Sequence, residues 1–318
     1  MSALVEASGL TRIYRMARPH PFAARTALRA VDDVSLAVAK GRSFGVVGES
    51  GSGKSTLARL VMALERPDGG TVRFAGEDLF ALRPAELRAR RRGFQMVFQD
   101  PYGSLDPRLA VARIVAEPLD VAEPGLGGGE RLARVREMLD AVGLPADAAQ
   151  RYPHEFSGGQ RQRIAIARAL ITHPDLIVLD EAVSALDVSV QAQVLNLLLE
   201  LEEKRGLTYF FISHNLAVIE HVAAEVAVMY RGRVVESGAA REVFEQPAHP
   251  YTQALVAAIP DPLAPGRRPS LALRDASEGA AGGCAFAPRC PRAEARCRES
   301  VPPLREVAPG RRAACVLL

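Results

Sequence analysis

The segment with the clearest chemical potential is Gly48-Glu49-Ser50-Gly51-Ser52-Gly53-Lys54-Ser55-Thr56, which matches the pattern G-x-x-x-x-G-K-S. Its glycines let backbone N–H groups approach phosphate oxygens, and a following helix start adds positive potential. Lys54 is expected to contact the β- and γ-phosphates, and the Ser55 hydroxyl to bind Mg²⁺. An ordinary glycine-rich turn is the alternative. We predict an ATP site whose nucleotide-binding residues are Gly48, Ser50, Gly51, Ser52, Gly53, Lys54, Ser55 and Thr56.

Two acidic residues follow a second apolar run. Leu176 to Leu179 is continuously apolar and leads directly into Asp180 and Glu181. Phosphoryl transfer to water needs an oxygen ligand for Mg²⁺ and a base that polarises the attacking water, and these two carboxylates fit the two roles. Seen alone, two acids after a strand are more often a solvated loop or a helix cap, so this prediction depends on the phosphate loop.

The elements that must position these residues follow a strand and helix alternation. Apolar runs predict strands at Ser43–Val47, Leu176–Leu179 and Leu207–Ile212, and helical spacing predicts helices at Lys54–Leu64 and from an Asp187 cap to Leu201. Strand, helix, strand of this kind implies a parallel sheet. We therefore expect an α/β fold in which the polar strand ends meet at one edge of the sheet, where ligands bind in open α/β folds.

The rest of the chain divides into a helical part and a tail. Arg108 to Gly143 reads mostly as helices, broken at Glu123-Pro124-Gly125 and at Gly127-Gly128-Gly129. After Pro260 the sequence becomes rich in Pro, Gly, Ala and Arg without periodicity, and all four cysteines lie beyond it. We predict a main domain over 1–259, with a helical subdomain over about 100–170, and a cysteine-containing extension over 260–318.

Composition limits the function classes. The formal net charge is only +3 for 318 residues, so a dominant role in nucleic-acid binding is not expected. The N-terminus lacks the apolar stretch of a secretory signal, and the most apolar window, 209–230, is interrupted by His214, Asn215, Glu220, His221 and Glu225. We expect a cytosolic chain whose membrane role, if any, comes through partners.

A second anion-binding helix start occurs at Ser157-Gly158-Gly159-Gln160, hereafter the signature segment. It combines a Ser cap, two glycines and a polar first turn just before the Asp180 strand. The phosphate loop already provides one complete phosphate cradle. A second cradle predicts a second nucleotide.

Together these segments make the chain resemble the nucleotide-binding subunit of an ATP-binding cassette (ABC) transporter up to about Pro260. By this resemblance Tyr14 matches the aromatic that stacks on adenine, Gln99 the glutamine that senses Mg²⁺ and the membrane partner, and His214 the switch histidine. Ser184-Ala185-Leu186-Asp187 matches the loop that communicates between subunits. Seen singly, Tyr14 could be a core aromatic, Gln99 a turn residue and His214 a helix cap.

The resemblance implies a shared site in a head-to-tail pair of cassettes. The signature segment of one subunit closes over the ATP held by the other, so Ser157, Gly158, Gly159, Gln160 and Asp187 are expected to act in trans. Within one subunit it implies catalytic roles for Glu181, His214 and Gln99, and Mg²⁺ bound by Ser55, Gln99 and Asp180. It also implies a P-loop ABC ATPase core with an antiparallel β subdomain and a helical subdomain.

Three segments narrow the resemblance to the dipeptide, oligopeptide and nickel importer branch: Gln99 to Arg108, Asp180 to Gln193, and His249 to Leu255. Ala182 departs from that branch, which usually has proline there. The resemblance implies a second ABC ATPase subunit, more often a paralogue than an identical copy, two transmembrane permease subunits and an extracytoplasmic solute-binding protein. It places the chain peripherally on the cytoplasmic face of the cell membrane. Peptides are the favoured cargo, and nickel or another small solute is the alternative.

The four cysteines of the extension also resemble that branch, whose members are reported to carry an iron–sulfur cluster. Five, six and seventeen residues separate them, without the close C-x₂₋₄-C pairs of structural zinc sites. Arg289, Arg292, Arg296 and Arg298 flank them and could offset the charge of a thiolate-bound cluster. A [4Fe-4S] cluster is the favoured interpretation, with four free thiols as the alternative, for Cys284, Cys290, Cys297 and Cys315.

Two other classes share the catalytic residues. Soluble ABC ATPases of DNA repair insert coiled coils or zinc modules between phosphate loop and signature, and those of translation carry two cassettes in one chain; neither feature is present here. A degenerate cassette that does not hydrolyse ATP is disfavoured because Lys54, Asp180, Glu181 and His214 are all retained.

Overall fold

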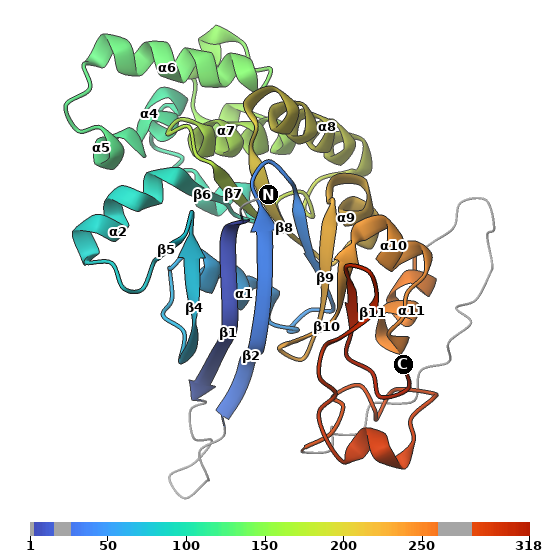
Figure 1. Cartoon of the computed structure of the whole chain (residues 1–318). Helices are drawn as coiled ribbons and strands as arrows, with labels where there is room; N and C mark the ends of the chain where they lie inside the picture. Colours follow the sequence, from blue (N-terminus) through green and yellow to red (C-terminus); the bar gives the residue numbers. More distant parts are fainter. Residues whose placement is uncertain (1–2, 16–26, 260–281) are drawn as a thin grey trace, which may run out of the picture.

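The computed structural model describes residues 3–15, 27–259 and 282–318. Its centre is a sheet with the strand order β11-β12-β10-β9-β3-β8-β7-β6 (Figure 1). The five strands from β9 to β6 run parallel, which confirms the predicted parallel sheet. These strands are β3 (Phe44–Val47), β6 (Phe94–Val97), β7 (Leu176–Asp180), β8 (Thr208–Ser213) and β9 (Glu225–Tyr230).

Both faces of this sheet are buried, which explains why its strands are continuously apolar. Successive side chains of a strand point to opposite faces. In β3, Val47 belongs to the core that includes the helical subdomain, and Val46 belongs to a second core on the other face. In β8, Tyr209 and Phe211 join the first core, whereas Phe210 and Ile212 join the second.

The second core lies under an antiparallel sheet with the order β2-β1-β4-β5. This sheet and helix α1 (Lys54–Val61) cover one face of the parallel strands. The helix that the sequence predicted over Lys54–Leu64 ends three residues earlier in the structure, at Val61. The strands are β1 (Ala3–Arg15), β2 (Ala27–Ala39), β4 (Gly69–Phe74) and β5 (Glu77–Asp78).

The other face carries the predicted helical subdomain, drawn in green at the top of Figure 1. The predicted break at Gly127-Gly128-Gly129 is wrong in part, because α6 begins at Gly128 with Gly127 as its cap. The apolar residues Val135, Met138 and Leu139 hold this helix in the core. The subdomain contains α3 (Pro101–Ser104), α4 (Val111–Ala116), α5 (Leu119–Ala122), α6 (Gly128–Ala141) and α7 (Gly158–Leu170).

The remaining helices flank the sheet or connect its strands. Asp187 caps α8 as predicted, since its carboxylate accepts a hydrogen bond from the Val190 N–H. Within the described residues, no helix combines the length and the apolar character needed to cross a bilayer. These helices are α2 (Pro84–Arg90), α8 (Val188–Arg205), α9 (Leu216–Val222), α10 (Ala240–Glu245) and α11 (Pro250–Ala257).

The last described segment, 282–318, extends the central sheet. A hairpin of β11 (Arg305–Ala308) and β12 (Arg311–Ala313) pairs with β10 (Arg233–Ala239). The predicted boundary at residue 260 lies outside the described residues, but the segment beyond that gap shares its sheet and core with the main domain.

Candidate functional site

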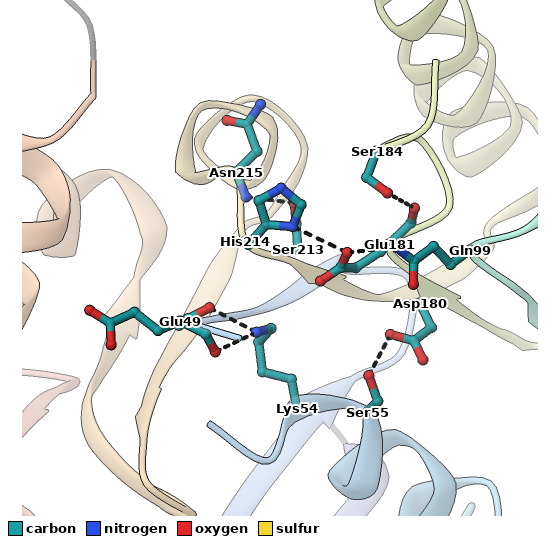
Figure 2. Close-up of polar contacts among 11 residues, drawn as sticks. Glu49, Lys54, Ser55, Gln99, Asp180, Glu181, Ser184, Ser213, His214 and Asn215 are labelled. Carbon is teal, nitrogen blue, oxygen red and sulfur yellow. Dashed lines mark hydrogen bonds and ion pairs between the residues drawn. The ribbon is translucent and has the colours of Figure 1, made fainter. Parts of the chain in front are cut away.

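The phosphate loop joins β3 to α1 at the carboxyl edge of the parallel strands (Figure 2). Two of its glycines are required by the fold. Gly48 has φ +152° and a Cβ there would lie 2.2 Å from the Met229 carbonyl oxygen. Gly53 has φ +103° and its Cβ would lie 2.1 Å from the Ala30 carbonyl oxygen. Any side chain at either position would displace the loop from the backbone beneath it.

Lys54 is 5% exposed and lies over this loop. Its ammonium donates hydrogen bonds to the carbonyl oxygens of Gly48 at 2.7 Å and Glu49 at 3.0 Å. Burial lowers the pKa of Lys54, opposed by the carboxylates of Glu181, Asp180 and Glu49. The buried Lys54 ammonium is hydrogen-bonded only to neutral carbonyl groups of the loop in the contacts given above, so its charge is not neutralised by them. This arrangement is suited to binding an anion.

The Ser55 hydroxyl and the Asp180 carboxylate meet, as predicted for a Mg²⁺ site. Ser55 Oγ donates to Asp180 Oδ1 at 3.1 Å, joining the start of α1 to the end of β7. Burial raises the pKa of Asp180, opposed by the hydrogen bond from Ser55. A half-buried carboxylate beside a hydroxyl offers the oxygen ligands that Mg²⁺ prefers, so these residues fit the ion.

Three neighbouring strands each deliver one of the predicted catalytic residues. Gln99 follows β6, Glu181 follows β7 and His214 follows β8 (Figure 2). Glu181 Oε2 accepts from Gln99 Nε2 at 3.2 Å and lies 3.1 Å from His214 Nδ1. The three side chains converge because their strands are adjacent and parallel in the sheet.

The backbone at Glu181 is held in an unusual conformation. Glu181 has φ +48°, in the left-handed region that non-glycine residues rarely occupy. Its N–H donates to the Ile212 carbonyl at 2.9 Å, and its own carbonyl accepts from Ser184 Oγ at 2.9 Å. Such strain is found where the surrounding structure fixes a functional side chain.

The signature segment forms the start of α7 with the expected cap. Gln160 N–H donates to Ser157 Oγ at 3.3 Å, and Ser157 N–H donates to Gln160 Oε1 at 3.0 Å. A Cβ on Gly159 would lie 2.2 Å from Val190 Cγ1, so glycine allows α7 to pack closely on α8. Ser157 and Gln160 remain exposed.

Comparison with known proteins gives consistent matches. Residues 31–184 match the ABC transporter family model, and residues 235–297 match the C-terminal region of oligopeptide/dipeptide transporters. The chain is 52% identical over 291 residues to a probable peptide ABC transporter ATP-binding protein of Sinorhizobium fredii, covering 91% of this chain and 82% of that protein. The chain belongs to the ABC transporter ATP-binding family.

Two further matches extend this assignment. A dipeptide transport ATP-binding protein of Haemophilus influenzae is 46% identical over 317 residues, with 98% of this cassette and 96% of that protein covered. A solved dimeric cassette bound to ADP and Pi after hydrolysis has a TM-score of 0.66 and 30% identity, covering 74% of this chain and 99% of that one. The cassette is accordingly an ABC ATPase that binds and hydrolyses ATP.

Tyr14, the predicted adenine-stacking residue, lies on β1 of the cassette. Its hydroxyl donates to Glu65 Oε2 at 2.6 Å, and the Arg12 guanidinium lies 5.0 Å from its ring centre. The ring is partly buried and fixed at one end. Its role toward a base stays a prediction.

Sequence reasoning missed two residues that contact the phosphate loop of the cassette. The Glu49 N–H donates to the Tyr251 hydroxyl at 2.8 Å. The Glu49 carboxylate accepts hydrogen bonds from Nη1 and Nη2 of Arg289 at 2.8 and 3.0 Å. The sequence feature that could have indicated such a contact was the acidic residue Glu49 within the phosphate loop. An acidic residue inside a phosphate loop needs a nearby cation to offset its repulsion of the ligand.

The four cysteines of the cassette line one cavity of about 10 Å³ together with Phe286 and Leu317. Cys290 and Cys297 are buried, and the Cys284 N–H donates to the Cys297 carbonyl at 2.8 Å. Burial raises the pKa of the Cys284, Cys290 and Cys315 thiols. Within the described residues, no group of three or more His, Cys, Asp or Glu side chains has the arrangement of a metal site.

Proposed function

We propose that this cassette is the ATP-hydrolysing subunit that drives an importer of dipeptides or oligopeptides. The observation that carries the proposal is the Glu181 carboxylate held between Gln99 and His214, beside Lys54 and the Ser55–Asp180 pair. The match of residues 235–297 and the names of the relatives favour peptides over nickel or another solute. The same names favour a transporter subunit over a soluble ABC ATPase.

The side chains divide the chemistry among them. Lys54 and the loop N–H groups bind the phosphates. Ser55, Asp180 and Gln99 would supply oxygen ligands for Mg²⁺, which would neutralise charge on the phosphate oxygens when bound. Glu181 accepts a proton from the attacking water, and the oxygen of that water bonds to the γ-phosphorus as the bond to the β-phosphate oxygen breaks. His214, whose Nδ1 lies 3.1 Å from Glu181 Oε2, orients this carboxylate. It is also proposed to contact the γ-phosphate. Tyr14 stacks on the adenine.

A second cassette completes the site. Ser157, Gly158, Gly159 and Gln160 form a helix start, exposed at Ser157 and Gln160, that binds the ATP held by the partner, and Asp187 contributes from the start of α8. The dimeric form of the solved cassette supports this arrangement. The partner cassette is proposed to be a paralogue.

The permease subunits are proposed to dock in a groove beside Gln99. This groove has a volume of about 410 Å³ and its lining includes Leu64, Phe98 and Val121, which are 48%, 46% and 60% exposed. Arg88 and Arg92 also line it. A lining of exposed apolar and basic side chains suits a short amphipathic helix of a membrane subunit. Such docking places the cassette on the cytoplasmic face of the membrane, and the solute-binding protein joins through the complex.

The four cysteines are proposed to bind a [4Fe-4S] cluster. All four thiols line one cavity and supply the thiolate donors that such a cluster uses, with arginines nearby in sequence to offset negative charge. In the described residues the thiols are not arranged as a metal site and the cavity is only about 10 Å³, so loading requires the segment to open around the cluster. Iron and acid-labile sulfide in anaerobically purified protein test this directly. Absence of both, with no zinc, leaves four free thiols.

Isolation of the intact complex tests the main proposal. The cassette purified from detergent-solubilised membranes should bring two permease chains and a second cassette, and peptides should stimulate its ATP hydrolysis in the presence of the solute-binding protein. A complex that lacks membrane subunits, or one stimulated by nickel and not by peptides, contradicts it.

A further inference from the structure

The C-terminal segment 282–318 is anchored to the cassette beside its phosphate loop. Phe286 is 1% exposed and lies among the rings of Tyr230, Tyr251 and His249, with centre distances of 5.4, 5.4 and 5.9 Å. Tyr230 ends β9, the strand next to β3, and β3 leads into the loop. The aromatic cluster therefore connects the cysteine segment to the strands that carry the nucleotide site.

Arg289 extends from this anchor to the loop itself. Its terminal nitrogens Nη1 and Nη2 donate hydrogen bonds to the two carboxylate oxygens of Glu49 at 2.8 and 3.0 Å. A planar fork on a carboxylate fixes both position and direction, which a single contact does not. Arg289 is 20% exposed and Glu49 is 42% exposed, so water screens the pair in part.

Glu49 is thereby held from both sides. Its backbone N–H is bound by the Tyr251 hydroxyl, and its carbonyl accepts from the Lys54 ammonium at 3.0 Å. Lys54 faces the phosphate position, whereas Tyr251 and Arg289 hold the residue from the C-terminal side. Arg289 also neutralises an acidic side chain that would otherwise repel the phosphates.

The residues that carry Arg289 belong to the cysteine cavity. The Arg289 and Cys290 N–H groups both donate to the Phe286 carbonyl, at 3.0 and 2.9 Å. Phe286 and Cys290 line the cavity with the other three cysteines. A change at the thiols that moves this turn must also move Arg289.

We propose that the four-cysteine segment positions the phosphate loop, with Arg289 and Tyr251 as positioning residues that act through Glu49. The chemical state of the thiols then alters nucleotide affinity, and by linkage nucleotide alters the reactivity of the thiols. This inference rests on ATP binding at the loop, and it holds with or without a metal at the cysteines.

The test measures ADP dissociation constants by calorimetry for the natural chain and four variants. Arg289→Gln should weaken ADP binding about five-fold, the size expected for a half-exposed forked ion pair, with kcat changed less than about two-fold. The ADP affinity of Arg289→Lys should lie between those of the natural chain and Arg289→Gln, because lysine keeps the charge and loses the two-pronged hydrogen bonding. Tyr251→Phe keeps the aromatic cluster and should weaken binding about two-fold. Arg241→Gln is the matched control, since Arg241 pairs with Glu245 on α10 at 2.7 Å, outside the cysteine segment, and should leave binding unchanged.

A second readout follows the thiols. ADP should slow the reaction of the cysteines with an aromatic disulfide reagent in the natural chain and should slow it less in Arg289→Gln. Unchanged ADP affinity in Arg289→Gln, an equal loss in Arg241→Gln, or equal protection of the thiols in both chains overturns the inference. If nucleotide-free melting shows that Arg289→Gln is unfolded, Tyr251→Phe decides alone. A natural chain that binds no ADP refutes nucleotide binding at the loop instead.

Discussion

Substitution of Glu181 by glutamine tests the proposed chemistry most directly. Glutamine keeps the size of the side chain and one oxygen that can accept from Gln99 and from His214, which now lie 3.2 and 3.1 Å from Oε2. What it loses is the capacity to take a proton from water. Loss of a general base typically costs about 10²- to 10⁴-fold in rate, equal to about 3 to 5 kcal/mol in the activation barrier.

The size of the rate loss distinguishes the general base Glu181 from a residue that only orients it. With Mg²⁺ in excess, so that water takes the place of Gln99 as a ligand, Gln99→Ala removes one neutral donor to the carboxylate. That donor is worth about 0.5 to 1.5 kcal/mol, so the variant should slow hydrolysis by about 2- to 12-fold. Phosphate release in a single turnover measures both rates. Gel filtration with ATP should then show Glu181→Gln in a stable pair with its partner cassette, because ATP remains bound between them.

Two results refute the reasoning. Phosphate release by Glu181→Gln within ten-fold of the natural rate excludes Glu181 as the base. A loss in Gln99→Ala as large as that in Glu181→Gln shows that geometry, and not proton transfer, limits the reaction.

Three further predictions concern packing and pH. Gly159→Ala places a Cβ 2.2 Å from Val190 Cγ1 and should cost about 1 to 3 kcal/mol in urea unfolding, with recovery in the Gly159→Ala/Val190→Ala pair. Arg311→Met leaves the fully buried Glu236 without its cation at 3.1 Å and should cost about 3 to 5 kcal/mol, measured the same way. Burial lowers the pKa of His249 from 6.5 to about 4, so the unfolded chain takes up a proton first as the pH falls. About 3 kcal/mol of stability, fully present above pH 6.5, should therefore be lost as the pH falls to 4, and His249→Asn should flatten this part of the pH curve.

Each of these has a contrary outcome. No recovery in the Gly159→Ala/Val190→Ala pair means that the contact between α7 and α8 is not the cause. A Glu236→Gln/Arg311→Met pair as unstable as Arg311→Met alone excludes an uncompensated charge. An unchanged pH curve in His249→Asn assigns the acid instability to other groups.

The local parts of the site could be predicted from the sequence. The phosphate loop was recognisable because its glycines, Lys54 and Ser55 act within nine neighbouring residues. The cap at Asp187 and the reciprocal cap of Ser157 and Gln160 were also predictable, since each is formed over three residues. The error at Gly128 has a local cause as well, because glycine is tolerated in an exposed first helical turn when later residues are buried.

The sequence by itself determined the ATP-binding loop and the parallel strands, because these follow from dihedral preferences, caps and apolar patterns within short windows. The roles of Gln99 and His214 were implied only by the resemblance to a known family. Only the tertiary structure decided that Gln99, Glu181 and His214 meet, because their contact depends on β6, β7 and β8 lying side by side. It also decided that Arg289 pairs with Glu49, 240 residues away in the sequence. The pairing of β12 with β10 and the burial of Phe286 bring the C-terminal segment next to the phosphate loop.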